Sequence, residues 1–187
     1  MKFKTMAIAI AAIAIATGIT SCKKETVTPD DPNIMNGSFT KTMTIVPVSA
    51  AADSVDLNKD GLTEIQIQFQ NTGADTGAVI MAQYHQNIQF VVDGLTPAPY
   101  MKIFKQGDAM PTSAGVYQAG AYPSIKVSGY RFGLVNGEGY IVFRFTTGTK
   151  YQYGWMKVSI NSAYTEFKIL DFAYSILPDT PITVGSK

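Results

Sequence analysis

The sequence predicts an all-β domain over residues 37–187, built as an antiparallel two-layer β-sandwich, with a closed β-barrel as the alternative. From Gly37 onward, no stretch keeps the spacing of apolar residues that an amphipathic helix needs. The apolar segments are short and rich in Val, Ile, Thr, Tyr and Phe, and Gly, Asn, Asp and Pro separate them. Residues 64–70 alternate strictly between apolar side chains and Glu or Gln, which is typical of a strand with one buried face.

The expected strands follow one another at short intervals. In chain order they are residues 38–48, 64–70, 78–84, 88–92, 100–104, 131–135, 140–146, 151–160 and 165–174. The last four are expected to form an antiparallel meander, because Asn136-Gly137, the strongest short hairpin signal in the chain, and two further polar turns separate them. The earlier strands then supply the second layer. Residues 96–124, with four of the nine prolines, are expected to be the least regular part, and such loops often carry function.

The N-terminal segment predicts export. Residues 1–21 have a basic start followed by an apolar run at residues 6–19, which is too short for a transmembrane helix and typical of a signal peptide. The run ends in Ile19-Thr20-Ser21-Cys22, which resembles the lipobox of bacterial lipoproteins. In that family the cysteine thiol carries a diacylglycerol and becomes the mature N-terminus. The alternative is an ordinary secretory signal that is cut near Ser21.

Lipidation explains the one cysteine of the chain. Cys22 stands where a lipobox needs it, and an unpaired thiol in an exported protein otherwise needs an explanation. Two or more acyl chains anchor a protein stably, so the resemblance implies an outer membrane lipoprotein that faces the periplasm or the cell surface. Residues 22–36, polar and with two prolines, then form the lipidated cysteine and a flexible tether. The net charge of +1, with no basic cluster, gives no indication of a nucleic-acid partner.

A stretch rich in oxygen-bearing side chains, DLNKDGLTE at residues 56–64, predicts a structural calcium site. The proposed ligands are the side chains of Asp56, Asn58, Asp60 and Glu64 and the carbonyl of Leu62. The start resembles an EF-hand loop, but position twelve is Ile67 and a strand follows, so the loop is more similar to short calcium loops between β-strands. The alternative is a polar turn in which Asp and Asn cap their own backbone and Gly61 supplies a positive φ.

The sequence gives no sign of a catalytic site. His85 is the only histidine, no nucleophile elbow occurs, and zinc is disfavoured by the lack of ligands. A pair of carboxylates facing each other across a cleft, as a glycosidase needs, is not recognisable from sequence. The expectation is therefore a protein that is not an enzyme, with a small polysaccharide-acting hydrolase as the alternative.

The strand expected at residues 151–160 has two distinct faces. One face carries Tyr151, Tyr153 and Trp155, and the other carries Met156, Val158 and Ile160. The second face is expected in the core. The aromatic face is either a platform on which a ligand such as a sugar stacks, or a surface packed beneath a neighbouring loop, and the packing interpretation is favoured.

The C-terminal half also resembles a group of secreted bacterial β-sandwich proteins. The residues that carry the resemblance are YGWMKVS at 153–159, ILDFAY at 169–174 and PITVG at 181–185. The resemblance implies an exported β-sandwich and no particular activity. Together, these features predict a lipid-anchored binding or structural module of the cell envelope, stabilised by calcium, whose partner is a glycan or an envelope protein.

Overall fold

The computed structural model describes residues 31–44, 49–57, 61, 63–71, 76–82, 88–93, 100–127, 130–134 and 136–187. The strands are β1 (Ile34–Thr44), β2 (Ser49–Val55), β3 (Ile65–Asn71), β4 (Thr76–Ala82), β5 (Gln89–Asp93), β6 (Tyr100–Met101), β7 (Tyr117–Gln118), β8 (Gly120–Val127), β9 (Tyr130–Gly133), β10 (Gly137–Thr147), β11 (Lys150–Ile160) and β12 (Glu166–Ser175). One short 3-10 helix, η1 (Ala114–Val116), precedes β7. No helix in these ranges has the length and apolar character needed to cross a membrane.

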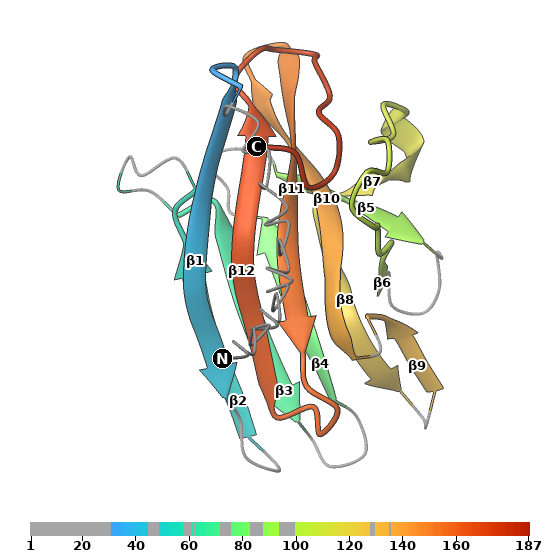
Figure 1. Ribbon diagram of the computed structural model, residues 1–187. Coiled ribbons are helices and arrows are strands. Elements are labelled where there is room, and N and C mark those ends of the chain that lie inside the picture. Colours follow the sequence, from blue (N-terminus) through green and yellow to red (C-terminus); the bar gives the residue numbers. More distant parts are fainter. Residues whose placement is uncertain are drawn as a thin grey trace, which may run out of the picture.

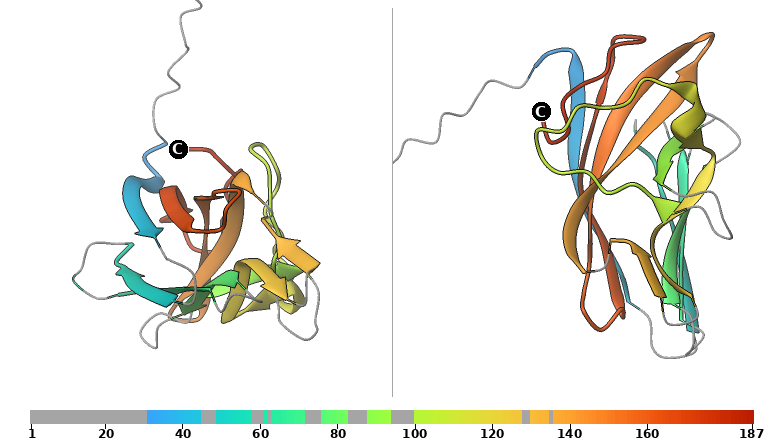
Figure 2. Two further views of the ribbon diagram at one scale, coloured as in Figure 1. Left: turned by 90° about the horizontal axis from the view of Figure 1, so that it is seen from below. Right: turned by 90° about the vertical axis from the view of Figure 1, so that its right-hand side faces the viewer.

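The strands form two layers that face each other (Figures 1 and 2). The front layer has the order β1-β12-β11-β10-β5, and the back layer has the order β2-β3-β4-β8 with β9 beside β8. The short strand β6 joins them, because it pairs antiparallel with β5 and parallel with β8. At the other side β1 and β2 end the two layers without pairing, so the sheet stays open. The all-β antiparallel sandwich is therefore confirmed, and the barrel alternative is not.

Two strands of the back layer, β2 and β8, are absent from the strands that the sequence predicts. The first, β2, pairs along its whole length with β3, and the second, β8, pairs with β4. Small residues dominate β2, and β8 contains Pro123, so neither has the aliphatic alternation that marks a strand. Backbone pairing with β3 and with β4 compensates for the weak strand preference of the β2 and β8 residues.

The predicted four-strand meander is wrong at its first turn. The strand β9 pairs with β8 through four residue pairs, from Ser124↔Gly133 to Val127↔Tyr130, so its hairpin partner precedes it in the chain. The meander therefore has the three strands β10, β11 and β12. Gly137 does adopt a positive φ of 78°, but it starts β10 instead of closing a hairpin with β9.

The predicted tether, residues 22–36, overlaps the domain at its end. Strand β1 already starts at Ile34, where it pairs with Ser175. Ahead of it, the Asp31 backbone N–H donates to the Lys187 carbonyl at 3.4 Å, and the Asp31 carboxylate accepts from the Asn33 N–H at 2.8 Å. These contacts close a turn at the start of the strand, so residues 31–36 belong to the folded domain.

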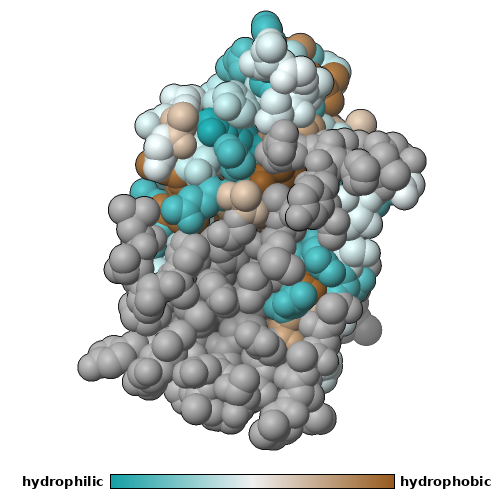
Figure 3. All heavy atoms as spheres, turned by 180° about the vertical axis from the view of Figure 1, so that it is seen from behind, coloured by the Kyte–Doolittle hydropathy of each residue, from teal (hydrophilic) through white to brown (hydrophobic). Residues whose placement is uncertain are grey.

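The central strands of the front layer, β10, β11 and β12, contribute buried side chains on both faces. Between the layers lies the main core, to which β10 and β11 contribute Ile141, Phe143, Met156 and Val158. On the outer face lies a second core that includes Val142, Tyr153, Trp155 and Val184. Figure 3 views the molecule from the side of the back layer, where the described residues at the surface are mostly hydrophilic or intermediate with smaller hydrophobic areas between them. The front layer therefore carries a second core on its outer face in addition to the core between the layers.

Candidate functional site

The second core exists because two segments cover the outer face of the front layer. One is the strap, residues 102–116, and the other is the C-terminal tail, residues 176–187. The strap crosses the sheet edge at Phe104, which exchanges backbone hydrogen bonds with Tyr140 at 2.8 and 3.2 Å, and then runs to the tail (Figure 2). There, the Gly107 N–H donates to the Val184 carbonyl at 2.9 Å, and the Val184 N–H donates to the Asp108 carbonyl at 3.0 Å. The strap and the tail thus form one continuous cover.

Trp155 holds this cover to the sheet. Its indole N–H donates to the carbonyl of Ser186 at 3.1 Å, and its ring meets Tyr140 edge-on with centroids 5.4 Å apart. Beside it, Gly154 leaves room for Phe143, because a Cβ at Gly154 would lie 2.5 Å from the Phe143 ring and 2.7 Å from the Ala173 carbonyl oxygen. The Gly-Trp pair in β11 therefore serves packing on both faces of the same strand.

The aromatic face does not form an open stacking platform at Tyr151, Tyr153 and Trp155. Trp155 is 1% exposed and Tyr153 is 5% exposed, while Tyr151 is half-buried. The Tyr153 ring contacts the ring of Tyr117, the residue that directly follows the strap, and the two ring centroids are 6.3 Å apart. Trp155 and Tyr153 therefore follow the favoured packing interpretation and not the platform alternative. The physical reason is that the cover removes their apolar surface from water.

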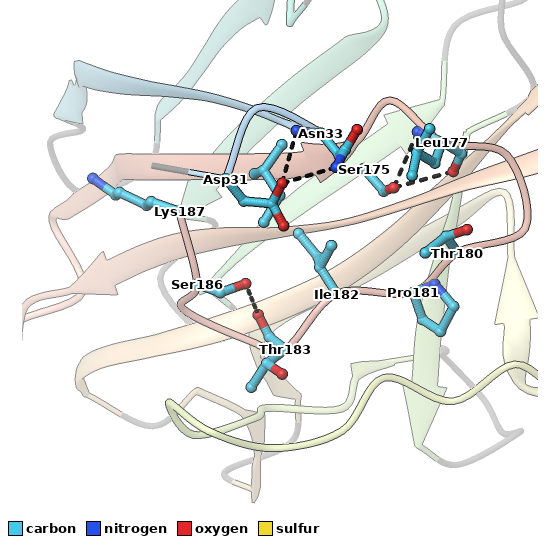
Figure 4. Close-up of a pocket in the computed structure, with 11 residues that line it drawn as sticks. Asp31, Asn33, Ser175, Leu177, Thr180, Pro181, Ile182, Thr183, Ser186 and Lys187 are labelled. Atoms are coloured by element: carbon cyan, nitrogen blue, oxygen red, sulfur yellow. Dashed lines mark hydrogen bonds between the residues drawn. The ribbon is translucent and has the colours of Figure 1, made fainter. Parts of the chain in front are cut away.

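A groove of about 400 Å³ opens where the tail meets the start of β1 (Figure 4). The lining residues come from the start of the domain, the end of β12 and the tail: Asp31, Asn33, Ile34, Ser175, Leu177, Thr180, Pro181, Ile182, Thr183, Ser186 and Lys187. Its walls therefore combine hydroxyl, amide and charged groups with aliphatic surface. Such a mixture suits the binding of a ligand through a few polar contacts and apolar packing.

The polar groups of the groove already hold its shape. The Ser175 hydroxyl donates to the Leu177 carbonyl at 3.0 Å and accepts from the Leu177 N–H at 3.1 Å, and the Ser186 hydroxyl donates to the Thr183 carbonyl at 2.7 Å. The Lys187 ammonium forms an ion pair with Asp171 on β12. Among the lining residues, Asp31 carries the one acidic side chain. The described lining residues thus offer polar groups that a ligand could contact, and they do not include the pair of facing carboxylates that glycoside hydrolysis needs.

An apolar rim lies beside the groove. Met35, Ile176 and Leu177 are the large hydrophobic side chains that remain exposed in the described part of the chain, at 46%, 42% and 42%. Ile176 and Leu177 form this rim, because Leu177 lines the groove and Ile176 directly precedes it. Met35 does not belong to it, because it pairs with Tyr174 on the main-core face of the sheet, whereas its neighbour Ile34 lines the groove from the other face. Clustered exposed hydrophobic side chains next to polar groups are typical of protein interaction sites.

The predicted calcium loop is described only in part. The Asp56 carboxylate accepts a hydrogen bond from the Gly61 N–H at 2.8 Å, and Gly61 has a φ of 90°. The Glu64 carboxylate accepts from the Leu57 N–H at 2.6 Å, and Glu64 is 2% exposed. The Asp56 contact is of the kind that the polar-turn alternative expects, and Glu64 fastens the loop backbone at Leu57. The remaining predicted ligands, Asn58, Asp60 and Leu62, lie outside the described residues.

Several other predictions fall outside the part of the chain that the structure describes. These are the signal segment at residues 1–21, Cys22 and His85. Within the described ranges, no three His, Cys, Asp or Glu side chains gather in a way that suits a metal ion. The calcium site, lipidation and export therefore stay predictions.

Sequence reasoning missed the groove. Its residues lie in the segment that the sequence predicts to be a tether, at the end of β12 and in the tail, for which the sequence predicts no binding role. The one local signal was the tail itself, whose Ile182 and Val184 alternate with polar residues as in a strand that packs on another surface. No protein-family model, no curated protein and no solved structure matches the chain. The site must therefore be interpreted from its own geometry.

Proposed function

We propose that this protein is a lipid-anchored binding module of the cell envelope without catalytic activity, and that the groove takes part of a protein partner. The observation that carries the proposal is the exposed apolar rim of Ile176 and Leu177 beside a groove of mixed polarity. A glycan is the less favoured partner here, because glycan sites commonly offer an exposed aromatic ring, and the groove is lined by none.

The anchor belongs to the same proposal. The groove includes Asp31, the first described residue of the domain, and in sequence this residue follows closely on Cys22. A lipid on Cys22 would keep the groove near the membrane surface, where another envelope protein is within reach. Two or more acyl chains make such an anchor permanent.

Calcium is the proposed stabilising ion of the loop at residues 56–64. Its support is the sequence pattern together with the position of the loop between β2 and β3, whose strand ends it would hold. The role would be structural, because an ion that binds only the folded chain stabilises it by mass action.

Site-specific photo-crosslinking in intact cells tests the partner. A crosslinking amino acid at Leu177, on the rim, is compared with one at Ala163, an exposed position in the turn between β11 and β12 at the other end of the sheet. We expect one or a few discrete adducts from Leu177 only. Thr180→Arg, which fills the groove from an exposed lining position, should remove them.

The proposal fails if Ala163 gives the same adducts or if Thr180→Arg leaves them unchanged. The anchor is tested separately by Cys22→Ser, which should abolish incorporation of labelled fatty acid and release the mature chain from the membrane fraction. Membrane-bound Cys22→Ser protein would exclude lipidation as the anchor while leaving the groove untouched.

A further inference from the structure

Arg144, in the middle of β10, is a buried cation on the outer face of the front layer. It alternates with Phe143 and Phe145, which point into the main core, and its exposed fraction is 3%. None of the ion pairs among the described residues involves it. Burying a charge without an opposite charge is costly, so a buried arginine of this kind needs a reason.

The guanidinium still has hydrogen-bond donors to offer. Its Nε and Nη2 both donate to the side-chain oxygen of Gln89, at 2.9 and 2.7 Å. A guanidinium has five N–H groups, so Gln89 occupies only part of this set. The Nη1 group has no acceptor in the described structure and is not fully enclosed. The outer edge of the guanidinium is thus available to an acceptor that arrives from solvent.

Two tyrosine rings fix the guanidinium in place. Its Cζ lies 4.2 Å from the ring centroid of Tyr117 and 4.0 Å from that of Tyr151. The Tyr117 hydroxyl donates to the Pro111 carbonyl at 2.7 Å, which ties the ring to the strap. The Tyr151 backbone is held by Asp179, which accepts from its N–H at 2.9 Å and donates to its carbonyl at 2.6 Å. Cation–π contacts and packing therefore orient the cation before any ligand arrives.

We propose that the Arg144 guanidinium binds the carboxylate of an acidic sugar. The free edge of a guanidinium matches the two oxygens of a carboxylate, with which arginine forms paired hydrogen bonds. Arg144 is 3% exposed, so a ligand that reaches its guanidinium must end in a small group such as a carboxylate. The guanidinium covers one face of the Tyr151 ring, but this side chain is only half-buried, so its remaining apolar surface and polar tip can contact the edge of the sugar. The site is independent of the protein partner proposed for the groove.

The test is a thermal shift of the full chain, purified in mild detergent, with glucuronate as the probe. Glucose at the same concentration controls for the sugar ring, and sodium chloride controls for ionic strength. A ligand at ten times its Kd should raise Tm by about 3–5 °C for a domain of this size, whereas glucose should not. Arg144→Gln should lose the shift, and Arg144→Lys, which keeps the charge but not the paired donors, should lose most of it.

A second measurement covers the case in which Arg144→Gln does not fold. In the unmodified protein, the arginine side-chain N–H resonance of Arg144, assigned through the Arg144→Lys variant, should move with glucuronate and not with glucose. A wild-type Tm unaffected by glucuronate, or the same shift in folded Arg144→Gln, overturns the proposal and makes Arg144 a packing residue. A larger shift with an acetylated peptide bearing a free C-terminus overturns the assignment to an acidic sugar.

Discussion

The substitution Trp155→Phe tests whether the tail is held to the sheet as the structure shows. It removes the indole N–H that donates to Ser186 and part of a ring that is 1% exposed. A lost hydrogen bond of this kind costs about 1 kcal/mol. Full truncation of a buried Trp costs about 3–5 kcal/mol, and Phe keeps more than half of the side chain, so the packing loss is about 1–2 kcal/mol.

The two losses together lower the free energy of unfolding by about 2–3 kcal/mol. For a domain of this size, each kcal/mol lowers Tm by about 2–4 °C, so a drop of about 4–12 °C is expected. Far-ultraviolet circular dichroism follows the melt in both proteins, because Trp155 is the only tryptophan and the variant has no indole signal. Limited proteolysis should also cut the tail of the variant first.

The matched control is Thr180→Ala. Thr180 is an exposed tail residue whose hydroxyl bonds only the nearby Pro178 carbonyl, so its loss should change stability by less than about 0.5 kcal/mol. A Trp155→Phe protein as stable as the control, with an equally resistant tail, would refute the view that Trp155 holds the cover in place.

Three further predictions concern Gly154 in the sheet, Tyr117 beside the strap and the loop at residues 56–64. Gly154→Ala should lower stability by about 1–3 kcal/mol in a denaturant melt, because the new Cβ would meet the Phe143 ring and the backbone at 2.5–2.7 Å. Burial, and to a smaller extent the nearby Tyr153, raises the pKa of the Tyr117 hydroxyl above its ordinary value. Arg144 acts in the opposite direction but does not cancel this effect. Above pH 10, the free energy of unfolding should therefore fall by up to about 1.4 kcal/mol per pH unit, and it should fall less steeply in Tyr117→Phe. Millimolar calcium should raise Tm relative to excess chelator, and Asp56→Ala should remove the difference.

The sign of the pH effect follows from which state holds the proton. Below the ordinary tyrosine pKa, the Tyr117 hydroxyl is protonated in both states and has no influence on pH dependence. Above it, the unfolded chain loses this proton while the folded chain keeps it, so rising pH favours unfolding. An equal alkaline slope in wild type and Tyr117→Phe would contradict this reasoning.

Each of the other two predictions has its own control. Gly115→Ala is matched to Gly154→Ala, because a Cβ at Gly115 meets nothing within 4 Å, and it should leave stability nearly unchanged. Equal effects of the two substitutions would show that the close approach at Gly154 is unimportant. If Tm is the same with calcium and with chelator, the loop at residues 56–64 is only a polar turn.

The sequence prediction was most reliable for strands whose own residues show a clear two-residue alternation. In β11, strict alternation separates Trp155 from Met156, and the structure places them in the two different cores. The strand β3 behaves in the same way, with Ile65, Ile67 and Phe69 all buried. Period-two alternation survives in any antiparallel sheet, because successive side chains must point to opposite faces.

The sequence failed where a distant segment decides the outcome. The Asn136-Gly137 pair is a strong local hairpin signal, yet β9 pairs with β8, because four residue pairs along an available strand outweigh the preference of one turn. The groove was missed for a similar reason, since Asp31 and Lys187 stand far apart in the chain and meet only when β1 pairs with β12.

By itself, then, the sequence determined that this chain builds an antiparallel β-sandwich and which face of each well-patterned strand is apolar. Only the tertiary structure decided whether an apolar face meets water, a second sheet or a returning segment of chain. The aromatic face of β11 shows the difference, since the same Tyr153 and Trp155 would be a stacking platform if bare and are a core beneath the strap and tail. The physical reason is that alternation is a local property of the backbone, whereas burial depends on contacts between segments that the chain brings together from far apart.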